Sequence, residues 1–342
     1  MNSKKIIHLE VIRILALFCI VYNHIGYTLF VYTENTLKFT VSLVLSILCK
    51  IGVPLFFMIS GALLLGREES WADVYKKRVL RIVAVIVLFT VIRFFYECYV
   101  TKTISFSLMQ LIKAILTGNL LHPYWFLYTY LSVLLLLPIL RLIIKNLDEQ
   151  GKKYFLMLIL VFDMIIPLKA LVINQDWQFS LLLDENICYL FLGYFIEHGL
   201  DKRHFTLKNK IIALSGAVIA VVISFWMVVR PYINGGEFAT TMIPVLSMPL
   251  ACALFYLIRG ASFRVRHENN IFSKLILQIG GCVFGVYLIE DYLRAFMVLL
   301  YGQYDLHIDN LERSLFSTLL VVIIGIPIAY IMKRIPILNK LL

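Results

Sequence analysis

Charged residues are scarce in this sequence. Asp, Glu, Lys and Arg make up only 15% of its 342 residues, whereas they account for about a quarter of an ordinary soluble domain. Hydrophobic residues contribute 61%, and the mean hydropathy is +0.87. This composition excludes a typical soluble protein and predicts an all-α, polytopic bundle of membrane-spanning helices.

Motifs for metal binding and disulfide formation are also missing. The six cysteines stand one at a time inside or beside apolar runs, without a CxxC pair or a cluster of cysteine with histidine. We therefore expect neither a zinc site nor a disulfide framework, and we interpret the cysteines as small core residues. The sequence also lacks internal repeats, low-complexity tracts and linkers, which predicts a single membrane domain over residues 1–342.

Basic residues outnumber acidic ones, and the formal net charge is +11. They gather in short segments between apolar runs, which is the positive-inside pattern of membrane proteins, so we expect no nucleic-acid partner. Windows of about 20 residues predict about ten membrane spans. These cover residues 6–32, 38–65, 79–100, 124–145, 153–173, 181–199, 210–230, 240–259, 273–300 and 314–335. With the N-terminus inside, loop Lys and Arg favour the cytoplasm by about three to one, which predicts that both termini are cytoplasmic.

The first span carries Glu10, Arg13, Asn23 and His24 in its apolar sequence. An ionisable side chain at the centre of a span costs about 2.5 to 3.5 kcal/mol, so several in one helix indicate function or mutual pairing. Arg13 and His24 are eleven residues apart, which is almost three helical turns, so they share one helix face about 16 Å apart. Because the stretch has no small-residue cleavage pattern, we expect a mature helix and not a signal peptide.

The order Glu10-x-x-Arg13 followed by His24 resembles the signature of the acyltransferase-3 family, bacterial membrane O-acyltransferases that use acyl-coenzyme A on extracytoplasmic sugars. Four more stretches resemble motifs of this family, in the family's order. They are Gly52-Val-Pro-Leu-Phe-Phe-Met-Ile-Ser-Gly61, Tyr75-Lys-Lys-Arg-Val-Leu-Arg-Ile82, Tyr124-Trp-Phe-Leu-Tyr128 and Gly285-Val-Tyr-Leu-Ile-Glu290. The family commonly has histidine where this chain has Glu290, and often has proline where it has Ala84. The resemblance covers most of the chain, although residues 145–280 match only in hydropathy.

The resemblance implies that the protein lies in the bacterial inner membrane and transfers an acyl group from cytoplasmic acyl-coenzyme A. Acetyl is the expected group, and the acceptor is a hydroxyl of a cell-envelope glycan or of a lipid-linked sugar. Acyl-coenzyme A is thus the donor substrate, membrane lipid and the glycan are the expected partners, and no metal is expected. The sequence does not decide which sugar accepts the group, or whether the protein is a monomer or a homo-oligomer.

His24 is the expected catalytic residue, because imidazole takes up and releases protons near neutral pH. It would act either as a general base or as an acyl-imidazole relay, and the sequence does not separate these roles. The alternative is a core histidine bonded to a neighbouring helix. Glu290 or Asp291 in the ninth span would orient the imidazole and stabilise its protonated form.

The expected donor-binding residues are Arg13, Ser60, Lys77, Arg78 and Arg81. Guanidinium groups suit phosphate oxygens, but a basic cluster also serves membrane topology, and Arg13 has an alternative partner in Glu10 one turn earlier. Both roles hold together if Glu10 orients Arg13. The run from Gly52 to Gly61 would bend the second helix and allow close approach around the donor channel, and simple helix packing is the alternative.

Trp125 and Tyr128, at the outer end of the fourth span, would stack on the acceptor sugar or shield the thioester. The alternative is an interfacial aromatic belt. Residues 105–117 have the pattern of a short amphipathic helix at the membrane interface.

Two rival functions fit the composition. Intramembrane charges and many spans are also typical of a transporter or flippase for a lipid-linked sugar or glycan precursor. A membrane scaffold for a glycan synthase is the other rival. The transporter does not explain the ordered set of motifs, and a scaffold would tolerate His24→Ala without loss of function.

Overall fold

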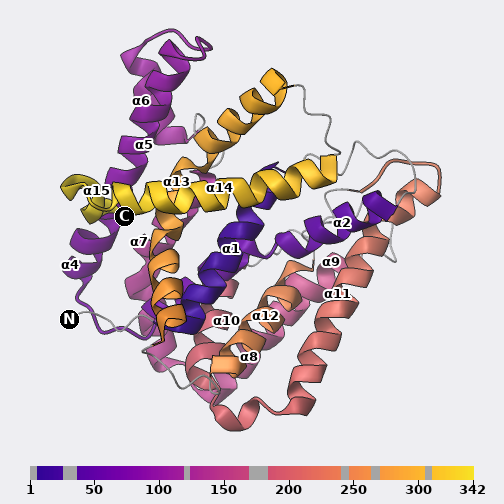
Figure 1. Ribbon diagram of the computed structural model, residues 1–342. Coiled ribbons are helices and arrows are strands. Elements are labelled where there is room, and N and C mark those ends of the chain that lie inside the picture. Colours follow the sequence, from indigo (N-terminus) through magenta and orange to yellow (C-terminus); the bar gives the residue numbers. More distant parts are fainter. Residues whose placement is uncertain are drawn as a thin grey trace.

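The computed structural model describes residues 6–25, 37–118, 124–168, 184–239, 246–262, 270–304 and 310–342, and the regular elements within them are all helical (Figure 1). The helices of the first half are α1 (Ile7–Ile25), α2 (Leu37–Cys49), α3 (Gly52–Leu64), α4 (Trp71–Val74), η2 (Tyr75–Val79), α5 (Leu80–Tyr99), α6 (Leu108–Thr117), α7 (Trp125–Asn146), α8 (Glu149–Ile159), η4 (Leu160–Ile165) and α9 (Ile166–Leu168). Those of the second half are α10 (Glu185–Gly199), η6 (Lys202–His204), α11 (Leu207–Ile233), α12 (Ser247–Ser262), α13 (Ile271–Tyr304), α14 (Asn310–Met332) and α15 (Pro336–Leu341).

Seven helical segments of the described chain are long and apolar enough to cross a membrane. They are Ile7–Ile25, Leu37–Leu64, Trp71–Tyr99, Trp125–Asn146, Leu207–Ile233, Ile271–Tyr301 and Leu311–Met332. The other three predicted spans, 153–173, 181–199 and 240–259, coincide with the shorter helical stretches α8 to α9, α10 and α12. The predicted helical membrane protein is therefore confirmed, while the count of about ten spans and the cytoplasmic termini stay predictions. Residues 26–32, 169–173, 181–183 and 240–245 of the predicted spans lie outside the described residues.

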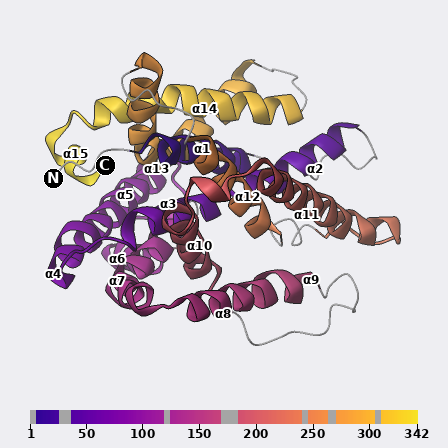
Figure 2. The ribbon, with the colours of Figure 1, turned by 90° about the horizontal axis from the view of Figure 1, so that it is seen from below.

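Helix α1 lies at the centre of the bundle. It packs against α13, α3, α14, α2 and α12, and Figure 2 shows it between α14 on one side and α8 and α9 on the other. Leu9, Ile12, Leu17 and Val21 are almost fully buried, so α1 has apolar side chains on the faces that contact its neighbours. A helix enclosed in this way can hold polar side chains only where neighbouring helices supply partners for them.

Helices α3 and α10 pack backbone to backbone. A Cβ atom on Gly61 would lie 1.8 Å from the Leu190 carbonyl oxygen, and one on Gly193 would lie 2.0 Å from the Met58 carbonyl oxygen. Only glycine fits such an approach, which is how small residues bring membrane helices together. Of the two alternatives for the run from Gly52 to Gly61, simple helix packing describes Gly61, which lies against α10. The second predicted span is also divided at residues 50–51, between α2 and α3.

The basic cluster lies on a π-helical turn. η2 carries Lys76, Lys77 and Arg78 and continues directly into α5, where Arg81 follows. A π-turn is wider than an α-turn and changes the rotation of the side chains before it relative to those after it, and such turns occur frequently at functional sites.

The predicted amphipathic segment forms α6. Its C-terminal end is tied to α7, because the Tyr128 hydroxyl donates a hydrogen bond to the Ile115 carbonyl oxygen (2.8 Å). Gly118, with a φ of 69°, ends the helix against the Tyr128 ring. Tyr128 therefore has a structural contact here, and its predicted role in sugar binding stays a prediction.

Candidate active site

A cavity of about 460 Å³ opens among α1, α3, η2, α5, α7 and α13. This volume is within the range of small-molecule sites. The cavity is lined by Arg13, Ile20, Phe56, Ile59, Ser60, Leu63, Leu64, Arg67, Glu69, Lys77, Arg78, Arg81, Ile82, Phe126, Tyr130, Leu134, Gly280, Gly281, Phe284, Tyr287 and Leu342. All five predicted donor-binding residues are among them, although they come from three separate segments of the sequence, α1, α3 and the continuous stretch of η2 and α5.

The cavity has a basic end and an apolar end. Helices α1 and α13 run in the same direction, because Gly280 lies against Glu10 while Glu290 pairs with His24 further along. Helix α3 runs the opposite way, since Gly52 at its start lies against Ile20. The basic side chains follow the end of α3 and therefore gather near Arg13, where Arg67, Lys77, Arg78 and Arg81 outnumber the one lining carboxylate. Such an excess of positive charge favours an anionic ligand.

Glu69 is that carboxylate, and it holds the arginines in place. Arg78 donates to both of its oxygens, from Nη2 (2.6 Å) and Nε (2.9 Å), and Arg141 donates from Nη2 (3.0 Å). Hydrogen bonds from Arg78, assisted by Arg141, lower the pKa of Glu69 to about 2. The bidentate contact fixes the plane of the Arg78 guanidinium beside the cavity and leaves further N–H donors on it.

Arg81 contacts the last residues of the chain. Its Nε donates to the Leu341 carbonyl oxygen (2.9 Å) and its Nη2 to that of Leu342 (2.8 Å). Leu342 itself lines the cavity. A ligand that uses Arg81 must therefore share this guanidinium with residues 341–342 or displace them.

Arg13 pairs with Glu10, as one of the two alternatives predicted. Its Nη1 donates to both carboxylate oxygens, at 2.6 and 2.7 Å. Glu10 is buried, while the Arg13 side chain is 23% exposed and lines the cavity. The two bonds use a single nitrogen of a group with five N–H donors, so pairing with Glu10 orients Arg13 without preventing it from binding a ligand.

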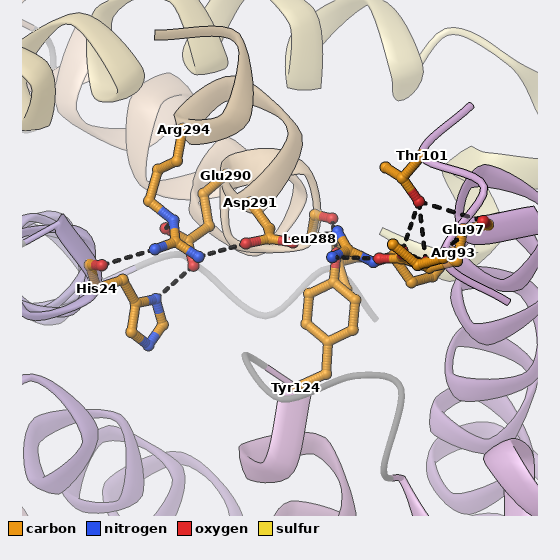
Figure 3. A network of polar contacts seen from close by, with 10 residues as sticks. His24, Arg93, Glu97, Thr101, Tyr124, Leu288, Glu290, Asp291 and Arg294 are labelled. Carbon is orange, nitrogen blue, oxygen red and sulfur yellow. Dashed lines mark hydrogen bonds and ion pairs between the residues drawn. The ribbon is translucent and has the colours of Figure 1, made fainter. Parts of the chain in front are cut away.

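His24 meets Glu290, the carboxylate predicted for it (Figure 3). Imidazole Nδ1 is hydrogen-bonded to Glu290 Oε1, and the Glu290 side chain is fully buried. An ionised carboxylate only accepts, so a neutral imidazole that bonds it through Nδ1 donates there and has its acceptor nitrogen at Nε2. This pairing of a buried carboxylate with an imidazole has the chemistry of a general base.

The pair belongs to a larger charged cluster between α1, α5 and α13 (Figure 3). Arg294 donates to the His24 carbonyl oxygen (2.6 Å) and to Asp291, and its Nε lies 3.6 Å from Glu290 Oε2. Asp291 also accepts from Arg93, whose Nη2 lies 2.8 Å from Glu97 Oε1. Arg294 thus holds the end of α1 by a hydrogen bond and lies within ion-pair distance of the Glu290 carboxylate.

His24 and Glu290 lie directly beyond the apolar end of the cavity. On α1 the lining residue Ile20 precedes His24 by one turn, and on α13 Tyr287 precedes Glu290 by three residues. Two neighbouring helices therefore direct the cavity toward the same polar pair.

Several residues of this site have weak sequence signals. Arg93, Glu97 and Arg294 are recognisable only as charges at i, i+3 and i+4 spacing in apolar helices. The Tyr124 hydroxyl donates a hydrogen bond to the Leu288 carbonyl oxygen, a contact that the sequence did not predict. The neighbouring Trp125 is the residue predicted to bind the acceptor sugar, and its side chain is 48% exposed. Within the described segments no group of three or more His, Cys, Asp or Glu residues could hold a metal ion.

Comparison with known proteins gives one match. The model of the acyltransferase-3 family, described as an acyltransferase domain, matches residues 6–334. Searches of curated proteins and of solved structures found no match. Because the family model covers nearly the whole chain, the protein belongs to the acyltransferase-3 family.

Proposed function

We propose that the protein transfers an acyl group, with acetyl as the expected one, from acyl-coenzyme A to a hydroxyl of a cell-envelope glycan or lipid-linked sugar. The observation that carries this proposal is the cavity, whose basic end gathers Arg13, Lys77, Arg78 and Arg81 and whose apolar end points to His24 and Glu290. Coenzyme A has the matching polarity, with phosphates at one end and the thioester at the other.

The dimensions support this orientation of the donor. Arg13 and His24 lie on one face of α1, eleven residues apart, which is about 16 Å along the helix. An extended phosphopantetheine arm has a comparable length. With the phosphates at Arg13 and Arg78, the thioester therefore reaches the neighbourhood of His24. The apolar lining around Ile20 and Phe284 keeps water from the thioester.

His24 acts as the general base in this proposal. Its Nε2 accepts the proton of the acceptor hydroxyl while the hydroxyl oxygen attacks the thioester carbonyl carbon. A C–O bond forms, the C–S bond breaks, and the proton passes from Nε2 to the leaving thiolate. The products are the O-acyl ester and free coenzyme A. Glu290 holds the imidazole by Nδ1 and compensates the charge of the imidazolium.

The catalytic assignment is tested in cells that carry either the wild type or His24→Ala at equal membrane abundance. We expect acyl transfer to envelope glycan to be lost, and undiminished transfer would refute the role of His24. His204→Ala is the matched control, because His204 is exposed and bonds Asp201 in a loop helix.

The donor assignment is tested with purified protein and labelled acetyl-coenzyme A. We expect hydrolysis or exchange of the label, with weaker donor binding in Arg13→Ala. A protein that binds no acyl-coenzyme A and releases no acyl group would instead favour the flippase function. Unchanged donor affinity in a folded Arg13→Ala protein would limit Arg13 to its pair with Glu10.

A further inference from the structure

Helix α15 lies beside α5, where the basic residues of the cavity gather (Figure 1, Figure 2). Pro336 starts this helix after a turn over residues 333–335 that follows α14. None of the residues of α15 is buried. Short elements with little buried surface open at a low cost in free energy. Few contacts therefore hold α15 on the bundle, and those with Arg81 are prominent among them.

The contacts of this segment with Arg81 have the geometry of a bidentate ligand. Nε and Nη2 lie on one edge of the guanidinium and donate to the backbone oxygens of two consecutive residues, Leu341 (2.9 Å) and Leu342 (2.8 Å). A guanidinium edge of this kind pairs with two oxygens of one phosphate or carboxylate. The backbone of residues 341–342 thus occupies the position on Arg81 that a donor phosphate would take.

The side chain of Leu342 also fills space at this end of the cavity. It lines the cavity, and its Cδ1 atom lies 3.7 Å from the position of a Cβ atom on Gly285. Residue 342 therefore reaches from Arg81 on α5 to α13. A ligand that takes both the edge of Arg81 and the space of Leu342 has to displace this segment.

We propose that α15 is a self-inhibitory segment, which holds Arg81 through residues 341–342 in the free protein and is displaced when acyl-coenzyme A binds. This inference rests on the proposed acyltransferase function, because it concerns the regulation of the same donor site. The donor phosphates also bind Arg13 and Arg78, which α15 does not use, and these further contacts drive the exchange. Because the apparent affinity of a site falls with the fraction of protein that is open, α15 sets the concentration of acyl-coenzyme A at which the protein works.

The experiment compares the binding of acetyl-coenzyme A by the purified wild type and by a variant that lacks residues 336–342. The closed state predominates in this proposal, and the apparent Kd is the intrinsic Kd divided by the open fraction. We therefore expect the deletion to lower Kd at least about threefold. A smaller decrease, no change, or an increase in Kd would overturn the proposal, because α15 would then not compete with the donor.

Substitutions test the same contact without shortening the chain. Leu342→Ser removes the apolar side chain that reaches α13, so it should lower Kd in the same direction as the deletion, by a smaller factor. Ile337→Ser is the matched control, because Ile337 lies on the same helix, is 72% exposed and does not line the cavity. An equal effect of Ile337→Ser would overturn the proposal.

A double-mutant cycle tests the role of Arg81. In Arg81→Gln the guanidinium edge for which α15 and the donor compete is lost, so the gain in affinity from the deletion should shrink. An undiminished gain in that background would contradict the assigned contact.

Hydrogen exchange of the α15 amides gives a readout that does not depend on turnover. The amides of Asn339 and Leu342 donate to the carbonyl oxygens of Ile335 and Leu338, at 2.8 Å each. A helix of this length is unstable once it leaves the bundle, so acetyl-coenzyme A should speed exchange in residues 336–342. Slower exchange would mean that α15 closes over the bound donor, and it would overturn the proposal.

The outcomes separate this inference from the proposed function. If the wild type transfers the acetyl group in a manner that depends on His24, but the deletion does not lower Kd, only the inference fails. If neither the wild type nor the deletion variant binds or turns over acyl-coenzyme A, the proposed function fails and the inference fails with it.

Discussion

Replacing Glu290 by glutamine changes the charge around His24 while keeping the size of the side chain. The cluster contains the carboxylates of Glu97, Glu290 and Asp291 and the guanidiniums of Arg93 and Arg294. Three negative and two positive charges sum to −1 while His24 is neutral, and to zero after His24 accepts a proton. In Glu290→Gln the sum starts at zero and becomes +1, at a position that is fully buried.

The same substitution disturbs the proton on the imidazole. A glutamine can present its NH₂ group to Nδ1, which moves the imidazole proton to Nε2, where it blocks acceptance from the hydroxyl. Loss of a general base or of its orienting carboxylate reduces turnover about 10²- to 10⁴-fold, or about 3 to 5 kcal/mol in the barrier. The donor KM should stay within about twofold of the wild-type value, because Glu290 lies outside the cavity lining and the contacts that bind the donor in the ground state are unchanged.

The assay is acyl transfer by equal amounts of membrane-inserted protein over a series of acetyl-coenzyme A concentrations. Glu97→Gln is the matched control, since it removes the same charge from the far end of the cluster, where Glu97 contacts Arg93 and Thr101. We expect less than about a tenfold loss there, because a charge that does not touch His24 contributes less. A kcat of Glu290→Gln close to that of the wild type would refute the assigned role of the carboxylate.

Three further predictions concern other parts of the molecule. Arg294→Gln should lower kcat about 10- to 100-fold with the donor KM unchanged, because Arg294 contacts both His24 and Glu290 without lining the cavity. Arg294→Lys should restore part of the lost kcat. An increase in KM alone would contradict this prediction. The folded state lowers the pKa of Glu69 from 4.5 to about 2, so its ion pairs stabilise the protein fully above about pH 4.5 and lose this effect as the pH falls toward 2. The difference in thermal stability between wild type and Glu69→Gln should therefore be constant from about pH 8 to 5 and shrink at lower pH. Gly61→Ala should destabilise the protein by about 3 kcal/mol or more. Gly199→Ala should not destabilise it, because no heavy atom lies within 4 Å of the new Cβ atom. Thermal unfolding of both variants in detergent measures the difference.

Hydropathy was enough to locate the helices. Within the described residues, each of the ten predicted spans coincides with a helical stretch, because a bilayer requires long apolar segments whose backbone groups are bonded internally. Helices α10 and α12 have only 15 and 16 residues. Hydropathy does not decide whether they cross the membrane, since a short helix can be enclosed by protein at any depth. The tight contact of Gly61 with α10 was also not predictable from sequence, because a single glycine does not indicate which helix packs against it.

The site was predictable where one helix contains it and less so where several helices build it. The spacing of Arg13 and His24 follows from the helical repeat alone, and the pairing of Glu10 with Arg13 from their three-residue separation. The convergence of Ser60 and Arg78 with Arg13 in one cavity rested on a resemblance, because tertiary packing decides it. Glu69 and Arg294 had no such support, and their importance arises from partners on other helices or loops.

The distribution of charge along α1 matches what the proposed acyl transfer requires at each end. Near Arg13 the cavity lining has five basic side chains and one carboxylate, which suits a donor whose charge is negative before and after the reaction. Around His24 the cluster has a surplus of one negative charge, which suits a group that is positive only while it holds the transferred proton. A basic surplus at His24 would oppose that proton, and an acidic surplus at Arg13 would repel the donor. Because α1 is a buried helix that fixes both ends about 16 Å apart, the two environments stay separate, and neutralising Glu290 should impair catalysis without strengthening donor binding.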